Sequence, residues 1–427
     1  MRYRIPYGKG ELEFEIPLRM NVKVIESKRV EAIQDLENST YLALKEPLFS
    51  ESLKDLASKA ETVCIVFTDL TRSCPDHVFI KALIEELLKA GIKEKDIVLL
   101  CGTGMHRSLT LEEKRLKLGR DIADRFRCLD HYPLDQGKLK WLGYTDQNIP
   151  IFINKTAVDA DLLISTGIVE PHQYAGYSGG RKSITIGVGG AETIRHTHSP
   201  ALLDHPNTRL GSINGNPFHH AITEGARRAG LNFILNSVND AEGRPVKIMA
   251  GHWQSCYLEL VQFAKAIYET PLSGQYDVVI AGVGYPKDIN LYQASRAASY
   301  IFFAPRCPLK EDGIIILPAQ CPEGVGKGVG EQNFFKILKS EKDMSRLIQR
   351  LKSEKYPPGA QRAFIMAKVL EKTKIILISD MDPEIIKALH MLYAPDINKA
   401  LQMASHLLNK RSLDILILPH SMLTLTC

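Results

Sequence analysis

The sequence predicts an α/β protein with two domains, each built on a mainly parallel sheet, and a cleft between the domains. The length of 427 residues suggests two or three domains, at roughly 100–200 residues per domain. Short apolar runs rich in β-branched residues recur along the chain, end in glycine-rich turns and alternate with helical patterns, as in parallel α/β sheets. With 44% hydrophobic and 24% charged residues, the composition is that of a globular protein rather than a disordered chain, a collagen or a coiled coil.

The first domain is predicted to span residues 1–265. Polar and apolar residues alternate over 3–16, which predicts an antiparallel strand pair. The apolar runs that predict its buried strands lie at 63–67, 97–101 and 162–167. A helical pattern at 78–90 follows the first of these runs. Because ligands bind at the carboxyl ends of parallel strands, the residues after these three strands are the first candidates for a site.

The second domain, residues 270–427, begins after a helical pattern at 254–269. The apolar runs that predict its strands lie at 276–282, 313–318, 374–379 and 413–418. A second parallel sheet is therefore expected. A glycine-rich turn at 321–328 suits either closure against the first domain or a long turn.

Charge and cysteine usage exclude several classes of protein. The net charge of +5, from 54 basic and 49 acidic residues, is small and evenly spread, which argues against nucleic-acid binding. None of the eight cysteines forms a CxxC pair, so neither a zinc ribbon nor a dithiol redox pair is expected. The start has no signal-peptide pattern, and no apolar run approaches the roughly 18 residues of a membrane helix. Scattered free thiols fit a cytoplasmic protein.

Two strand-end loops carry candidate residues. The first contains Asp69, Thr71 and Arg72 and leads into a helix, so its N–H groups and the guanidinium suit a carboxylate or a phosphate. A plain capping turn with a solvated arginine explains the same residues. In the second loop, His106 follows a Gly-Thr-Gly turn, where a histidine serves as a general base, a ligand or a structural residue.

The third loop, residues 166–183, is the most specific. It combines His172 with the turn Ser178-Gly179-Gly180 and with Lys182. The P-loop pattern does not fit, because Arg181 separates the last glycine from the lysine. The N–H groups of the turn nevertheless suit an anion.

Further candidates lie downstream. His196 and His198 are two residues apart; on a strand both face one side, and on a loop either one can bind metal. His219 and His220 follow an Asn-Pro turn and are interpreted as structural.

A second-domain segment offers three polar groups. Tyr292, Gln293 and Arg296 place a hydroxyl, an amide and a guanidinium within one helical turn, if the segment is helical. An ordinary amphipathic helix is the alternative interpretation.

Five motifs follow one another from about residue 69 to residue 296: TDLTRxxP, GTGMHR, EPHQYAGYSGGRK, RHTHSP and NLYQA. In this order and spacing they resemble the lactate racemase family that uses a nickel-pincer nucleotide. The EPHxxAGxSGGxK segment is highly specific, and the α/β pattern on either side extends the resemblance over essentially the whole chain. The resemblance implies an isomerase, a 2-hydroxy acid racemase or epimerase that is a monomer or homodimer. Its implied partners are the small 2-hydroxy acid and cofactor-biosynthesis proteins.

The resemblance also implies roles for individual residues. The cofactor is a pyridinium-3,5-bisthiocarboxylic acid mononucleotide in which a carbon and two sulfurs bind nickel, and one arm is attached to Lys182. His198 is the implied protein ligand, which agrees with a square-planar nickel that already has three pincer atoms and needs one imidazole. His106 and His172 are the implied acid/base pair. The remaining assignments are Arg72, Tyr292 and Gln293 near the substrate and Asp69 in support of the site.

The reaction explains the need for two histidines. The C2–H bond of a 2-hydroxy acid is weakly acidic, so its removal as hydride, while a base takes the hydroxyl proton, gives a planar 2-keto acid. Return of hydride to the other face inverts the configuration, and each hydroxyl orientation needs its own base. A proton-abstracting racemase also needs two bases, so the tether lysine does more to decide for hydride transfer.

One residue departs from the lactate enzymes. Arg296 stands where they have a lysine that helps to hold the substrate carboxylate. A guanidinium is wider, planar and bidentate. The departure favours a larger or more polar substrate, and lactate, malate, an aromatic acid and a sugar acid stay open.

Three other functions are less well supported. A zinc-dependent hydrolase using His196 and His198 lacks an HxxxH pair and an evident carboxylate ligand. A nicotinamide dehydrogenase lacks GxGxxG after a strand. A non-catalytic protein that binds a nucleotide cofactor is an alternative from another class, and the presence of both His106 and His172 argues against it.

Overall fold

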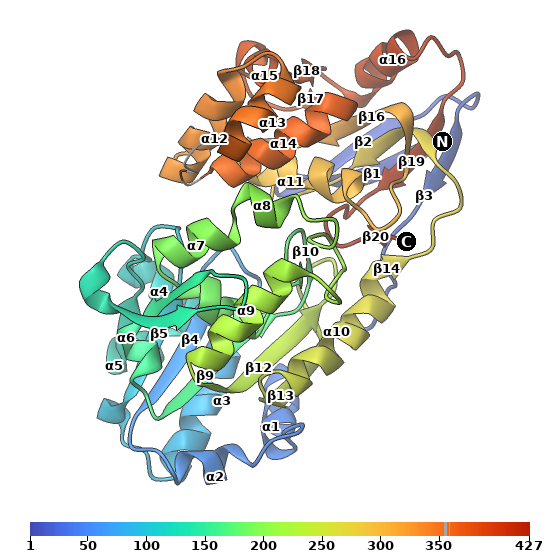
Figure 1. The fold of residues 1–427 in the computed structure, drawn as a ribbon. Coiled ribbons are helices and arrows are strands. Elements are labelled where there is room, and N and C mark those ends of the chain that lie inside the picture. The colour runs from blue at the N-terminus through green and yellow to red at the C-terminus, as the bar shows by residue number, and fades with distance from the viewer. Residues whose placement is uncertain (354–356, 358) are drawn as a thin grey trace.

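Two six-stranded sheets form the framework of the protein, one in each half of the molecule (Figure 1). The computed structural model describes residues 1–353, 357 and 359–427. The predicted α/β class with two mainly parallel sheets is confirmed.

The first sheet has the order β13-β12-β9-β4-β5-β6. Its strands are β4 (Val63–Thr68), β5 (Ile97–Gly102), β6 (Arg127–Asp130), β9 (Leu162–Ile168), β12 (Leu231–Asn239) and β13 (Pro245–His252). All neighbours are parallel except β12 and β13, which are antiparallel. Both β4 and β9 are buried along their whole length, which is why their sequences are continuous apolar runs.

The second sheet has the order β18-β17-β16-β15-β19-β3, and all its neighbours are parallel. Its strands are β3 (Asn21–Val24), β15 (Tyr276–Ala281), β16 (Leu309–Pro318), β17 (Lys374–Ile378), β18 (Leu392–Tyr393) and β19 (Asp414–Leu418). Four of these strands match the apolar runs predicted for the second domain.

Helices cover both faces of the sheets, since alternate side chains of β4 pack into two separate clusters. The helices of the first half are α1 (Leu36–Lys45), α2 (Leu53–Ala57), α3 (Asp76–Lys89), α4 (Leu111–Leu118), α5 (Arg120–Arg125), α6 (Lys155–Val158), α7 (Ala191–Thr197), α8 (Pro200–Leu203), α9 (Pro217–Arg228) and α10 (Ser255–Tyr268). Those of the second half are α11 (Leu291–Phe302), α12 (Val329–Lys339), α13 (Met344–Ser353), α14 (Ala360–Lys372), α15 (Pro383–Ala388) and α16 (Ile397–Leu407). No helix in the described part of the chain is long and apolar enough to cross a membrane.

Short strand pairs complete the fold. They are β1 (Arg2–Tyr7) with β2 (Gly10–Glu15), β7 (Leu139–Tyr144) with β8 (Pro150–Asn154), β10 (Pro171–His172) with β11 (Gly176–Tyr177), and β14 (Glu269–Thr270) with β20 (Leu425–Thr426). The antiparallel pair predicted at the start of the chain is confirmed as β1 and β2.

The N-terminal strands belong to the second half of the molecule. Strand β3 pairs with β19, and Figure 1 shows the blue N-terminal strands beside the red β19. Ile5 and Phe14 pack into the same cluster as Val278 and Ile417. The predicted first domain, residues 1–265, is therefore corrected at its start, because an alternating pattern predicts a strand without specifying the sheet that it joins.

Candidate active site

Three neighbouring strands of the first sheet, β9, β4 and β5, end at one edge and lead into the predicted site loops. Asp69 follows β4, His106 follows β5, and Glu170 and His172 follow β9. The carboxyl ends of parallel strands share an edge, so the fold brings these distant segments to one place.

His106 is held by a carboxylate. Its Nδ1 donates to Asp69 Oδ2 at 2.6 Å, and the Asp69 Oδ1 accepts from the Thr71 N–H at 3.0 Å. Burial opposes ionisation of Asp69, but the charges of His106 and Arg72 outweigh it and hold the carboxyl pKa well below its usual range. Whenever His106 is neutral, the ionised Asp69 holds the remaining ring proton on Nδ1, and Nε2 is then the proton acceptor.

His172 is held by backbone groups. The N–H groups of Tyr174 and Ala175 both donate to His172 Nδ1, each at 3.2 Å. A neutral imidazole that accepts at Nδ1 carries its proton on Nε2. Burial lowers the His172 pKa well below its ordinary value, and the positive charge of Lys182 lowers it further. His172 is therefore a neutral donor through Nε2, the opposite tautomer to that of His106.

The serine–glycine turn is not the open anion cradle that the sequence suggested. Ser178 Oγ donates to the Ile168 carbonyl at 2.7 Å and accepts from the Glu170 N–H at 3.0 Å. The Gly180 N–H donates to Asn236 Oδ1 at 2.9 Å. Ser178 Oγ–H and the Gly180 N–H therefore already have hydrogen-bond partners within the protein. The reason for expecting them to bind the cofactor, that these donors are free, no longer holds.

The turn instead fixes the start of the segment that carries Lys182. Gly179 has a φ of +87°, and a Cβ there would lie 2.8 Å from Asn236 Oδ1 and from Val169 Cγ2. Only glycine combines this backbone conformation with so close an approach. Gly179 thus holds the loop against β12 and contributes to the site through the position of Lys182.

Lys182 has an unusually acidic ammonium group. Burial lowers its pKa to about 7, and the charges of Arg72 and Arg296 act in the same direction against Asp69 and Glu170. A large fraction of the amine is therefore neutral near pH 7. A neutral amine is the nucleophilic form of lysine.

His198 presents one free nitrogen. Its Nδ1 donates to the Ile194 carbonyl at 2.9 Å, so Nε2 carries the lone pair. Burial lowers its pKa to about 4, which keeps the imidazole neutral at pH 7. The rings of Tyr174 and Phe218 pack edge-on to it, with centroid distances of 5.6 and 5.1 Å.

The sequence suggested a strand or a loop around His196 and His198, and this expectation is wrong. His196 lies within α7, and His198 caps the C-terminal end of that helix. At about 100° per residue, side chains two apart on a helix point in nearly opposite directions. His196 faces Arg195 and Glu192 on the outside, with the Glu192 carboxylate at 3.7 Å. Within the described residues, no three His, Cys, Asp or Glu side chains are grouped to hold a metal. The zinc-hydrolase interpretation therefore loses its ligand pair.

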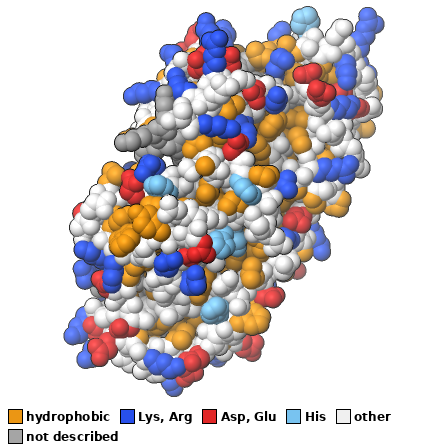
Figure 2. Space-filling model, viewed as in Figure 1, with side chains coloured by type: hydrophobic (Ala, Val, Ile, Leu, Met, Phe, Trp, Pro, Cys, Tyr) orange, Lys and Arg blue, Asp and Glu red, His pale blue; other side chains and the backbone are white. Residues whose placement is uncertain are grey.

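The second half contributes α11. Asn290 caps this helix by accepting from the Gln293 N–H at 3.0 Å, so Tyr292, Gln293 and Arg296 lie on one helix as the spacing suggested. Arg296 donates to Gln293 Oε1 at 3.4 Å and to the Tyr300 hydroxyl at 3.2 Å. In the space-filling view, a notch separates the two halves on one side and histidine side chains lie near it (Figure 2).

Contacts between the halves also include residues that the sequence did not single out. The Tyr300 hydroxyl donates to the Pro171 carbonyl at 3.0 Å, next to His172. Lys287 forms an ion pair with Glu170 at 3.6 Å, and burial lowers the Lys287 pKa to about 8. A cavity of about 120 Å³ lies there, lined in part by Glu170, Lys287, Arg296 and Tyr300. No local motif marks these pairs, because each joins segments more than 100 residues apart.

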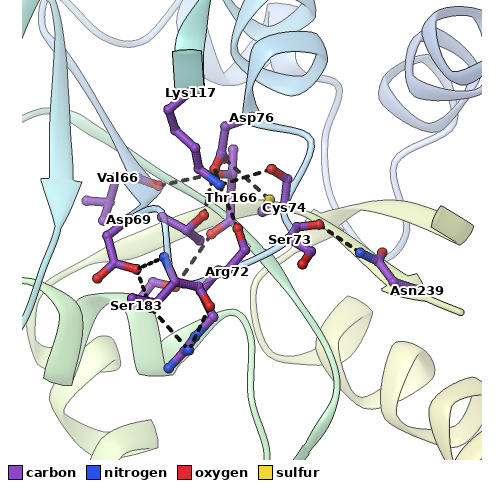
Figure 3. A network of polar contacts seen from close by, with 12 residues as sticks. Val66, Asp69, Arg72, Ser73, Cys74, Asp76, Lys117, Thr166, Ser183 and Asn239 are labelled. Carbon is purple, nitrogen blue, oxygen red and sulfur yellow. Dashed lines mark hydrogen bonds and ion pairs between the residues drawn. The ribbon is translucent and has the colours of Figure 1, made fainter. Parts of the chain in front are cut away.

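A buried polar network contacts the backbone of the Arg72 loop (Figure 3). Lys117 Nζ lies 3.1 Å from Asp76 Oδ2 and donates to the carbonyls of Arg72 and Cys74 at 2.8 and 3.1 Å. Asp76 also accepts from the Thr68 hydroxyl at 2.6 Å. Neither Asp76 at the start of α3 nor Lys117, distant along the chain, was singled out in the sequence.

Charge–charge interactions link several of the candidate residues. Arg72 and Arg296 both act on Lys182 and His172, and His198 acts on His172. His106 joins this group through Asp69, which acts on Lys182. That His106 and His172 face each other across a substrate-sized space stays a prediction.

Two family profiles match the chain. The profile described as "Lactate racemase N-terminal domain" matches residues 7–211, and "Lactate racemase C-terminal domain" matches residues 273–424. A curated protein named lactate racemase from Thermoanaerobacterium thermosaccharolyticum is 32% identical over 412 residues, which are 96% of this chain and 95% of that protein. Another lactate racemase, from Lactiplantibacillus plantarum, is 31% identical over 366 residues, which are 85% of this chain and 84% of that protein.

Solved structures agree with these matches. The lactate racemase apoprotein from Thermoanaerobacterium thermosaccharolyticum superposes with a TM-score of 0.91, 30% identity and complete coverage of both chains. A protein from Thermotoga maritima superposes with a TM-score of 0.69 over 89% of this chain and 98% of that one. Its identity of 20% shows likeness of fold alone.

Proposed function

This chain belongs to the lactate racemase family, and we propose that it interconverts the C2 epimers of a 2-hydroxy acid by hydride transfer to and from a lysine-tethered nickel-pincer nucleotide. The observation that supports this most directly is Lys182. Its amine is partly neutral near pH 7 and lies on the loop that presents His172, under the influence of Arg72 and Arg296.

The residues fit such a cofactor. The nucleophilic Lys182 amine suits acylation by a thiocarboxylic arm, and the free Nε2 of His198 suits a metal that lacks one ligand. Lys182 acts electrostatically on His198, so both groups lie near one site. When bound, the nickel-pincer nucleotide supplies an acceptor and donor of hydride.

The side chains of this protein then handle the carboxylate and the protons. Arg72 and Arg296 bind the substrate carboxylate, as paired guanidinium groups do well. His106 Nε2 takes the hydroxyl proton of one epimer, and Asp69 stabilises the imidazolium that forms. On the other side, His172 would supply the proton that the oxygen of the planar 2-keto acid needs. It would do so as an imidazolium, because a neutral imidazole that lost its proton would become an imidazolate.

The test is to produce the protein together with enzymes that build the cofactor and to measure intact mass and nickel content. Wild-type protein is expected to carry one covalent adduct and nickel. Lys182→Ala should remove the adduct, Lys182→Arg should remove it while keeping a positive charge, and His198→Ala should lower nickel while the adduct persists. An adduct on Lys182→Ala protein would contradict the tether assignment.

The hydride mechanism has its own test. With substrate deuterated at C2, the label should stay on carbon through many turnovers, since hydride need not exchange with water. Rapid loss of deuterium to solvent would favour proton abstraction instead. The proposal places the enzyme in the cytoplasm with cofactor-building proteins as partners, as a monomer or homodimer.

A further inference from the structure

Arg362 on α14 is a buried cation whose side chain reaches the His172 segment of the other half. It is 5% exposed. Its NH1 donates to Ser299 Oγ at 3.0 Å and its NH2 to Gln173 Oε1 at 3.2 Å. Among the described residues, no carboxylate forms an ion pair with this guanidinium. A buried charge without a counterion is costly unless a ligand supplies one.

Two unpaired donors lie next to this cation. Gln173 Oε1 also accepts from Ser299 Oγ at 2.9 Å, and since an arginine contacts the oxygen of an amide, Nε2 is the other end. Gln173 Nε2 and the Tyr174 hydroxyl are both buried without a partner among the described residues. Their side chains are 4% and 6% exposed. Burial raises the pKa of the Tyr174 hydroxyl, and the positive charges of Arg362 and Arg296 act against this effect.

Another buried arginine, Arg181, has more acceptors around it than Arg362 has. Arg181 also lacks a carboxylate among the described residues, but it donates to the carbonyls of Gly179, Ala175 and Tyr177. It also contacts His219 Nδ1 at 2.6 Å and stacks on the Tyr257 ring at 3.8 Å. Four acceptors thus contact the terminal nitrogens of Arg181, although its Nε is unpaired among the described residues. Arg362 has two acceptors, and the two unpaired donors beside it belong to other side chains. This difference points to a missing acceptor at Arg362.

We propose that Gln173, Tyr174 and Arg362 bind a second anionic group, a carboxylate or a phosphate ester, on the 2-hydroxy acid. The inference rests on the proposed function and narrows its substrate class to dianionic 2-hydroxy acids. Arg296 and Ser299 lie one helical turn apart on α11, so a site for the C1 carboxylate at Arg296 and a second anion site at Arg362 are neighbours. An anion there accepts from the Gln173 amide, the Tyr174 hydroxyl and the Arg362 guanidinium, and these are strong charge-assisted bonds.

The experiment measures binding by isothermal titration to the full-length chain made without and with cofactor. Two matched pairs of probes differ by one anionic group: lactate and malate, and glycerate and 3-phosphoglycerate. The dianion is expected to bind about tenfold or more tightly than its matched monoanion. Preference for malate indicates a carboxylate and preference for 3-phosphoglycerate indicates a phosphate.

Two variants test the residues. Gln173→Glu places a carboxylate against Arg362, so it should abolish the preference for the dianion without lowering the thermal midpoint. Tyr174→Phe removes one hydroxyl from a packed ring and should reduce the preference by about threefold to tenfold. His106→Ala serves as the matched control, because it should stop catalysis and leave the binding preference intact.

Three results would overturn the inference. They are equal binding within both probe pairs, a preference that survives in Gln173→Glu, and a preference that disappears once cofactor is loaded. The last result would assign the anion site to the phosphate of the nucleotide. If dianions bind through Arg362 but no 2-hydroxy acid is racemised, the proposed function fails while the anion site stands.

Discussion

The two histidines proposed for catalysis sit in opposite surroundings. The side chain of His106 is 47% exposed and is bound by the Asp69 carboxylate, whereas His172 is bound by two backbone N–H groups among positive charges. A negative charge lies next to His106, whereas amide donors and cations oppose an imidazolium at His172. The same residue type is thereby placed in two different electrostatic environments.

This asymmetry bears on the reverse reaction. When the other epimer is the substrate, His172 must accept a proton. Its Nε2 already carries one in this tautomer, and its Nδ1 faces two N–H donors. Either the turn at Tyr174 and Ala175 shifts or the imidazolium exists only briefly. The two surroundings are therefore expected to respond differently to pH and to mutation.

The largest effect is expected from loss of either imidazole. His106→Ala and His172→Ala should each lower kcat/KM by about 10²–10⁴-fold, as for other general acids and bases. Since enantiomers in water have equal free energy, the loss must be the same in both directions for a true racemase. Polarimetry from each pure enantiomer measures it, with adduct mass and nickel content as controls for loading. Retained activity in either variant would remove that histidine from the acid/base pair.

The next test concerns the buried pair of Lys117 and Asp76, which supports the loop that carries Asp69 and Arg72. Lys117→Met leaves Asp76 buried without its cation, which should cost about 3–5 kcal/mol of unfolding free energy. The double variant Asp76→Asn, Lys117→Met removes both charges and keeps a hydrogen-bonding side chain at position 76, so it should recover part of that loss, apart from the two Lys117 hydrogen bonds to carbonyls. Urea unfolding measures both. A single variant as stable as the wild type would show that the pair does not hold the loop.

Lys182 is one of the positively charged groups that act on His172. A lysine is nucleophilic above its pKa, and for Lys182 that value is about 7 instead of 10.5. In cofactor-free protein at pH 8, acylation of Lys182 by an activated ester should exceed that of exposed lysines by roughly 10²-fold. Peptide mass spectrometry across pH 5–9 should show the rate rising through about pH 7. A rate that still rises steeply above pH 9 would contradict the lowered pKa.

Replacing the carboxylate next to His106 should have a smaller effect than removing the imidazole. Asp69→Asn keeps the shape of the side chain but removes the charge that favours imidazolium, so kcat is expected to fall by about tenfold to a hundredfold. The pH profile of kcat should also change, because residue 69 no longer supplies a negative charge next to His106. Among the described residues, no side chain forms a hydrogen bond with the His172 ring, so this change is specific to one side. An unchanged pH profile would show that Asp69 has only a structural role.

The sequence predicted the buried strands and the loops at their ends because both depend on local pattern. Strand β3 was missed as a member of the second sheet, because its four residues alternate weakly and its partner lies almost 400 residues later. The i and i+2 spacing of His196 and His198 did not reveal a short helix. The roles of Lys117 and Arg362 could not be predicted from the sequence, because they depend on carbonyl and amide groups that only the tertiary structure brings near these residues.

The smallest effect is expected at Arg296, which acts on His172 and Lys182 but is not among the main charges that act on Asp69. Arg296→Lys keeps the positive charge, so His172 should stay neutral and the pH profile of kcat should be unchanged. A lysine cannot donate to both Gln293 and Tyr300 in the planar geometry of a guanidinium. The change should therefore appear in KM, rising about threefold to tenfold for the preferred acid and less for lactate. Arg296→Met, which also removes the charge, should shift the pH profile as well. A profile that moves equally in both variants would show that the shape of Arg296, and not its charge, governs His172.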